Sequence, residues 1–297
     1  MSAKDVVIVA MQASVFLTVL TVGMQTSVSD LRSLFAQPAR LVRALLAMNV
    51  LGPIIAVMVC SMFALHPAVV VGLVTLAVAP VAPLFPRKIL PLVAPGNVAY
   101  AHGLFFASAV LSVLLTPLAV EALESHYAVE HQIPALVVAK VVVATMLLPL
   151  GIGLAVGRLW PAAARLIPTI QKVGMLVLLV GLVLLVKAVW PMLASLFRER
   201  TLAAIAIIAL LGLAAGHLLG GPDEDERTVL ATAAVSRHPG VAIAIASLTA
   251  QPLAPAGVLL ALLVSAIAVR PYVSWRKRRL RPVVPPVVPP VVPPAAT

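Results

Sequence analysis

The sequence predicts an all-α membrane protein with about nine transmembrane helices, two of them broken near the middle. Of its 297 residues, 62% are hydrophobic and only 10% are charged, whereas soluble domains are about 45–50% apolar and about 25% charged. The mean hydropathy is +1.12. The apolar runs are continuous rather than alternating with a period of two, which argues against a transmembrane β-barrel.

Nine apolar segments are long enough to cross a bilayer at about 20 residues per span. The expected spans are roughly 5–27, 38–63, 67–94, 96–121, 133–157, 168–194, 201–220, 226–250 and 253–274. Proline ends one helical stretch and can begin another. The third span and the residue that follows it contain five prolines, from Pro80 to Pro95, and the eighth span contains the sequence Ser-Arg-His-Pro-Gly at 236–240. Each of these two spans is therefore predicted to consist of two half-helices.

The two breaks lie at corresponding places in two halves of the chain, about 5–121 and about 133–274, because one further span follows each break. Such a pattern indicates a transporter built from inverted repeats, with a binding site near the bilayer midplane. We expect one transmembrane transporter domain over residues 1–275. Residues 276–297 combine a basic cluster with a repeated Pro-Val-Val-Pro pattern, which is typical of a disordered polyproline II tail.

Lys and Arg in short loops predict the orientation in the membrane. With the N-terminus outside, the outer loops hold only Lys4, Arg198 and Arg200. The formal net charge of +11 then reflects topology rather than nucleic-acid binding, and the C-terminus is expected to be cytoplasmic in a multi-pass cell-membrane protein. The basic residues assigned to the inner side are Arg32, Arg40, Arg43, Arg158, Arg165, Lys172, Arg227, Arg276, Lys277, Arg278, Arg279 and Arg281.

Three cations, Arg87, Lys88 and Arg237, fall at the two breaks, and His238 follows Arg237. A charge at the bilayer centre costs at least about 2.5 kcal/mol, yet all ten Asp and Glu residues fall in loops or at span ends. The remaining partners are backbone carbonyls, water or an anion from outside, and half-helix N-termini also attract anions. These four residues are therefore predicted to bind a small organic anion. Alternatively, the cations only cap the carbonyl ends of the broken helices.

Other polar residues of the spans are weaker candidates. Hydroxyl residues at four-residue spacing usually serve helix packing in membranes, and we assign this role to Ser108, Ser112 and Thr116 and to the run from Thr228 to Ser236. His102 and His238 could each titrate near pH 6–7 and form a proton-linked site. The residues that we expect to line a cavity are Thr18, Thr21, Gln25 and Asn49.

Enzymatic chemistry is not expected from this sequence. It contains no His-Glu-x-x-His zinc motif, no Gly-x-Ser-x-Gly elbow and no Walker A spacing. The single cysteine, Cys60, excludes a disulfide framework and a thiolate zinc site. We expect neither a metal site nor a cofactor.

The chain resembles the bile acid:sodium symporter family over nearly all of residues 5–275. The resemblance implies a panel domain and a core domain, with the two broken helices crossing in the core, and secondary transport of organic anions by alternating access. The stretches that carry it are GMQTSVSDL at 23–31, Pro38, VGLV at 71–74, PGNVA at 95–99, LTPL at 115–118 and PGVA at 239–242.

The sequence departs from this family at the positions that hold sodium. Sodium-coupled relatives have a Gly-Gly-Thr-Ala-Ser-Asn stretch at the first break, and its Ser and Asn positions are occupied here by Arg87 and Lys88. Ala101 and Phe105 stand where hydroxyl ligands are expected. At the second break, Ala233 replaces the family's Glu, and its Gln-Asn pair falls on residues 237 and 238.

We therefore predict a carrier that does not use sodium and works as a uniporter, an exchanger or a proton-linked carrier. The runner-up is a sensor or accessory subunit of the same fold that binds an anion without moving it. A third possibility is that sodium still binds through backbone carbonyls alone. The expected partners are a small organic anion and the lipid bilayer, and no nucleic acid.

Overall fold

The computed structural model describes residues 3–27, 36–83, 98–127 and 132–279, and the elements are helical. The α-helices are α1 (Ala3–Gln25), α3 (Pro38–Leu45), α4 (Gly52–Met62), α5 (Pro67–Val78), α7 (Val98–His126), α8 (Ala135–Val142), α9 (Leu148–Leu159), α10 (Ile167–Ala188), α11 (Trp190–Leu196), α12 (Glu199–Leu219), α13 (Glu224–Val235), α14 (Pro239–Ala246), α15 (Ala254–Ala268) and α16 (Arg270–Arg279). Two π-helical turns, η1 (Leu46–Leu51) and η4 (Val143–Leu147), continue α3 into α4 and α8 into α9, and a 3₁₀-helix, η5 (Pro161–Leu166), precedes α10.

Six helical stretches of the described chain are long and apolar enough to cross a membrane. They are Pro38–Met62, Tyr100–His126, Ala135–Leu159, Pro161–Lys187, Glu199–Leu219 and Ala254–Arg279. Each overlaps one of the predicted spans, which supports a multi-pass membrane protein. The first and third predicted spans correspond to shorter apolar helices, Gln12–Gln25 and Pro67–Val78, and the eighth corresponds to α13 and α14. The total of nine spans stays a prediction.

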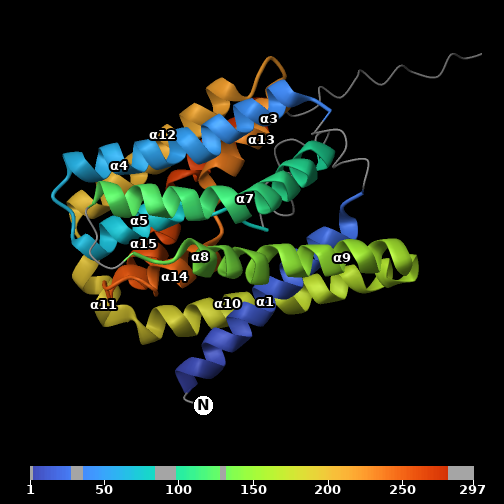
Figure 1. The fold of residues 1–297 in the computed structure, drawn as a ribbon, viewed down its shortest axis with the longest axis horizontal. Coiled ribbons are helices and arrows are strands. Elements are labelled where there is room, and N and C mark those ends of the chain that lie inside the picture. The colour runs from blue at the N-terminus through green and yellow to red at the C-terminus, as the bar shows by residue number, and fades with distance from the viewer. Residues whose placement is uncertain (1–2, 28–35, 84–97, 128–131, 280–297) are drawn as a thin grey trace, which may run out of the picture.

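The helices pack in two groups. In the first group, α1 packs against both α9 and α10. In the second, α5 packs against α15 and α14, and α12 packs against α13, α15 and α4. Figure 1 shows α1, α9 and α10 along one side of the molecule and α3, α4 and α12 on the opposite side, and α7 contacts α8, which continues into α9 through η4.

Glycine allows the helix backbones of the first group to touch. A Cβ atom at Gly153 of α9 would lie 2.1 Å from the carbonyl oxygen of Leu20 on α1, and a Cβ at Gly23 would lie 2.4 Å from the carbonyl oxygen of Leu150. Small residues at such contacts let transmembrane helices approach closely where the hydrophobic effect gives no driving force. The contact between α1 and α9 therefore depends on the absence of side chains.

This packing predicts a difference between two glycines of α9. Gly153→Ala should lower the free energy of unfolding by about 1–3 kcal/mol, because the added methyl group forces the helices apart. Gly151 has no atom within 4 Å of its would-be Cβ, so Gly151→Ala is the matched control and should leave stability unchanged or slightly raised. Thermal unfolding in detergent measures both. Equal melting temperatures for the two variants would contradict the close approach of α1 and α9.

Candidate functional site

The two regions predicted to contain breaks meet in the structure. The chain leaves α5 at Val78, and residues 236–238 separate α13 from α14. These non-helical segments form an antiparallel bridge between Val81 and Arg237. The amide of Ala82 donates to the carbonyl of Ser236 at 2.7 Å, and the amide of His238 donates to the carbonyl of Pro80 at 2.7 Å. Arg87 and Lys88 of the predicted site lie outside the described residues.

Hydroxyl groups of α7 complete the hydrogen bonding of the first segment. The amide of Val81 donates to Ser108 Oγ at 3.1 Å, and Thr116 Oγ1 donates to the carbonyl of Val78 at 3.0 Å. Buried backbone groups outside regular structure need such partners. Two members of the hydroxyl stripe on α7 therefore support the end of α5, beyond the simple packing role that their spacing indicates.

Arg237 is buried, with 4% of its surface exposed, and its guanidinium group contacts three backbone carbonyls. Its Nε donates to the carbonyl of Ala234 at 3.0 Å, and Nη1 donates to that of Ala79 at 3.1 Å. Its Nη2 donates to the carbonyl of Met48 in η1. Two of these acceptors lie at the C-terminal ends of α13 and α5, where the helix dipole is negative. No carboxylate within the described ranges lies within ion-pair distance of Arg237.

The π-helical turn and Gly52 shape the space for this cation. A π-turn breaks the regular helical hydrogen-bond pattern, and the Met48 carbonyl in η1 accepts from Arg237. A Cβ atom at Gly52, the first residue of α4, would lie 2.8 Å from Nη2 of Arg237. Asn49, predicted to line a cavity, belongs to the same turn and is half-buried.

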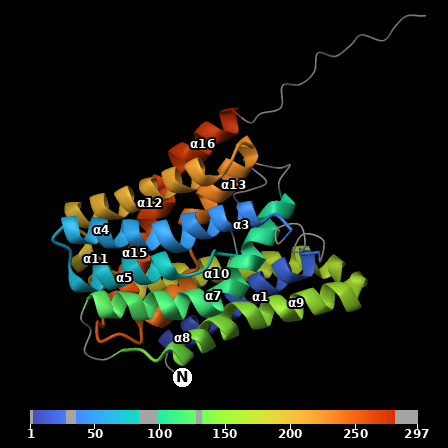
Figure 2. The ribbon, with the colours of Figure 1, turned by 45° about the horizontal axis from the view of Figure 1, so that its top comes forward.

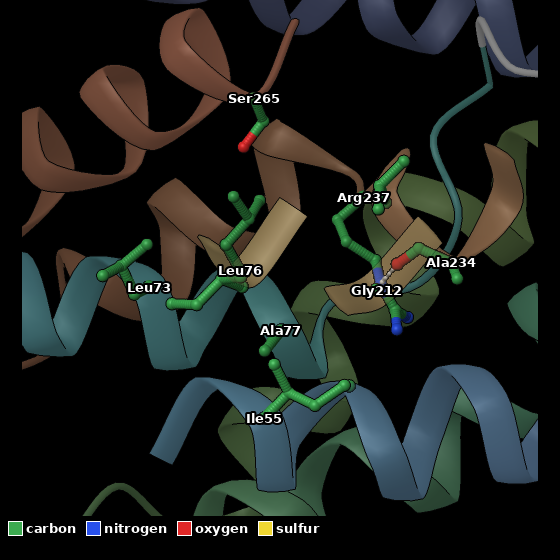
Figure 3. Close-up of a pocket in the computed structure, with 11 residues that line it drawn as sticks. Ile55, Leu73, Leu76, Ala77, Gly212, Ala234, Arg237 and Ser265 are labelled. Carbon is green, nitrogen blue, oxygen red and sulfur yellow. Dashed lines mark hydrogen bonds between the residues drawn. The ribbon is translucent and has the colours of Figure 1, made fainter. Parts of the chain in front are cut away.

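A small cavity lies beside Arg237 (Figure 3). Its lining includes Gly52, Leu73, Gly212 and Ser265, and its volume is about 50 Å³. This volume admits a few water molecules, whereas pockets for organic ligands occupy about 300–1,000 Å³. In this conformation the cavity beside the guanidinium is therefore too small for a bulky organic anion.

His238 has no exposed surface and caps the N-terminus of α14. Its Nδ1 accepts a hydrogen bond from the amide of Val241 at 3.2 Å. A neutral imidazole that accepts at Nδ1 carries its proton on Nε2. Among the described residues, Nε2 has no hydrogen-bond partner. The second segment therefore presents one buried donor without an acceptor, at the positive end of a helix.

The predicted residues of α1 lie in the other helix group. Thr18 Oγ1 donates to the carbonyl of Ser14 at 2.8 Å, and Thr21 Oγ1 donates to that of Thr18 at 2.9 Å. Gln25 is exposed, and its Oε1 accepts from Gln171 Nε2 at 3.3 Å. Both threonine hydroxyls thus bond within their own helix. His102, predicted as proton-linked, is buried on α7.

Gln25 also borders a second cavity, between α1 and α9. Its volume is about 310 Å³, which lies at the lower end of the range for organic ligands. Arg158 supplies a cation at its rim. The residues that line it are Met24, Gln25, Thr26, Ser27, Leu154, Gly157 and Arg158.

Sequence reasoning missed the carbonyl acceptor in η1 and the role of Gly52. The carbonyl carries no side-chain signal, because every residue has one. The pair Gly52-Pro53 inside an apolar run is the one local sign of irregular backbone at this point, since glycine permits close approach and proline removes a helical hydrogen bond.

The carbonyl contacts predict that Arg237 is needed for stability. Arg237→Gln should lower the free energy of unfolding, because a shorter neutral amide cannot serve three acceptors and each buried group left unpaired costs about 1–3 kcal/mol. Arg270→Gln is the control, since Arg270 is exposed. Thermal unfolding in detergent measures the change. If both variants melt at the wild-type temperature, the guanidinium does not hold the three segments together.

One family model matches this chain, that of the Sodium Bile acid symporter family, over residues 13–196. This range covers more than half of the chain and runs from α1 to α11, including the first of the two segments that meet at Arg237. A comparison with curated protein sequences finds no significant match. Members of the matched family are transporters and not enzymes, which agrees with the absence of catalytic motifs. On this match, the chain belongs to the sodium bile acid symporter family.

Proposed function

We propose that the chain is a secondary transporter of an organic anion, working by alternating access without sodium. The observation that carries the sodium-independent part of this proposal is the buried Arg237 guanidinium on the carbonyls of Ala79, Ala234 and Met48. Membership of the family supports a secondary transporter. Independence from sodium and the anionic substrate go beyond that membership.

The carbonyls around Arg237 are the type of ligand that sodium uses in transporters with broken helices, where unwound backbone coordinates the ion. A guanidinium fixed to the chain supplies positive charge at the same type of site and cannot dissociate. Helix ends that a bound ion would otherwise neutralise are thus neutralised permanently. Under this proposal, the substrate-competent arrangement needs no external cation.

Three features support an anion as the substrate. The buried side chain of Arg237 has no carboxylate partner in the described part of the chain. At the N-terminus of α14, the Nε2–H group of His238 has no hydrogen-bond partner among the described residues. Arg87 and Lys88 would add two cations, and Arg can clamp a carboxylate with two parallel hydrogen bonds. We assign all four residues to the substrate site.

The helix groups provide the moving parts under this proposal. We assign α1, α9 and α10 to the panel domain, and α3 to α5, α7 and α12 to α15 to the core domain. Alternating access would rock these parts against each other around the site. The structure would then be a closed conformation of the carrier, because the cavity beside Arg237, with a volume of about 50 Å³, excludes an organic anion. We retain four candidates for lining a cavity between the two domains: Thr18, Thr21 and Gln25 on the panel side, and Asn49 on the core side.

Uptake into proteoliposomes tests the coupling ion. A labelled bile acid, a dicarboxylate and a sulfonate serve as probes, after a thermal-shift screen has ranked them, because a ligand that binds the native state raises its stability. Uptake of the best probe should be equal in sodium and in choline buffer. Strict dependence on sodium would refute the proposal and favour coordination through carbonyls alone.

Counterflow separates transport from binding. Vesicles loaded with unlabelled anion should accumulate the labelled anion, because a carrier exchanges one for the other. A probe that raises the melting temperature but shows no counterflow would instead support a non-transporting sensor or accessory subunit.

Two variants of His238 test its role as a donor. His238→Asn keeps an N-cap for α14, whereas His238→Ala removes it, so Ala should be less stable than Asn by about 1 kcal/mol. Both variants lack the Nε2–H group, and both should weaken anion binding in the thermal-shift assay. Full affinity in His238→Asn would remove this residue from the substrate site. Uptake that is unchanged by an imposed pH gradient would exclude a proton-linked role.

A further inference from the structure

The last described helix, α16 (Figure 2), lies where the apolar run of the chain ends. The final membrane-span candidate is Ala254–Arg279, and its 26 residues would extend at most about 39 Å, against a hydrocarbon thickness of about 30 Å. Its second part has the sequence RPYVSWRKRR. Tyr and Trp with flanking basic residues are typical of the headgroup region of a bilayer.

One cation of α16, Arg276, holds the helix to α13. Its side chain is 1% exposed. Nε donates to Thr228 Oγ1 at 2.7 Å, and Nη1 contacts Glu224 Oε2 at 2.6 Å. The hydrogen bond from Arg276 lowers the pKa of the Glu224 carboxyl from its usual value. These contacts fix which side of α16 faces the protein.

The other basic residues of this turn, Lys277, Arg278 and Arg279, form no ion pair with a carboxylate of the described residues. No Asp or Glu follows Glu226 in the sequence. Within the described ranges, Glu224 pairs with Arg227 and Arg276, Glu226 pairs with Arg40, and none of these three ion pairs includes Lys277, Arg278 or Arg279. Among the residues that the structure describes, no ion pair therefore balances the positive charge on this part of α16.

Trp275 lies within the same cationic surface. It is 40% exposed, and the guanidinium carbons of Arg276 and Arg279 lie 5.2 and 5.1 Å from the centroid of its ring. Cation–π contacts of this kind stabilise the arrangement of the ring and the guanidinium groups. The exposed surface thus combines fixed cations with an indole ring that can sit among lipid glycerol and acyl groups.

We propose that this surface of α16, formed by Trp275, Lys277, Arg278 and Arg279, binds the headgroup of an anionic phospholipid. The cations contact the phosphate, and the indole ring contacts the adjoining apolar part of the lipid. Because Arg276 on the same turn is bonded to Glu224 and Thr228, a lipid bound here is one side chain away from α13, which ends at the candidate site. The proposal concerns lipid binding and does not require the chain to transport an anion.

Quenching of Trp275 fluorescence tests this site directly. The sequence has three tryptophans, and Trp160 and Trp190 are each 59% exposed. The background Trp160→Phe/Trp190→Phe leaves Trp275 as the only tryptophan reporter. The protein is reconstituted in phosphatidylcholine bilayers containing equal fractions of either brominated phosphatidylglycerol or brominated phosphatidylcholine. We expect Trp275 to be quenched by phosphatidylglycerol in preference to phosphatidylcholine, with a ratio of affinities on the order of fivefold. This ratio corresponds to the free energy of one Lys or Arg contact with an anionic lipid.

Two triple variants in that background locate the effect. Lys277→Gln/Arg278→Gln/Arg279→Gln should abolish the preference. The control is the triple variant Arg158→Gln/Arg165→Gln/Lys172→Gln, which also removes three positive charges. These three residues are exposed, and the sequence predicts them on the same side of the membrane as α16. The control should retain the preference. Raising the salt concentration should weaken the preference in the unsubstituted background, because salt screens exposed charges. Equal quenching by both lipids, or equal loss in the two triple variants, would overturn the proposal.

Discussion

The structure around the candidate site depends on one buried cation and the carbonyl groups that surround it. A guanidinium that is removed from water needs compensation, and internal carboxylates are the usual source. Here the compensation comes from backbone dipoles at the ends of two helices and from one π-helical turn. The same contact therefore satisfies three backbone carbonyls and compensates the charge of Arg237.

Under the proposed function, this arrangement would let the family fold keep its architecture without sodium ligands. Positions 101, 105 and 233 carry no polar side chain, and Ala101, Phe105 and Ala233 are fully buried and belong to the apolar core. Under the proposed function, the energetic link between an ion gradient and the substrate is absent. The direction of net flux would then follow the gradients of the anion or of an exchanged partner.

Much of the helical architecture could be predicted from the sequence, because apolar runs of sufficient length have few alternatives in lipid. The interruption at residues 236–238 was also predictable, since Pro239 begins a helix and cannot continue one. The sequence alone does not decide whether carbonyls, water or an anion are the partners of Arg237. That choice depends on the position of η1, a backbone feature without a side-chain signal. The spacing of the threonines of α1 predicts that they line a cavity, but it does not reveal that their hydroxyls bond within the helix.

The antiparallel bridge between Val81 and Arg237 has a consequence for biosynthesis. Its two strands of backbone are separated by more than 150 residues, so the carbonyl groups of the first segment emerge from the ribosome long before their partners. Because chains enter the membrane from the N-terminus onward, the first half must wait with an incomplete core until the second half arrives. The bridge can therefore form only after residues 236–238 have been synthesised, late in translation.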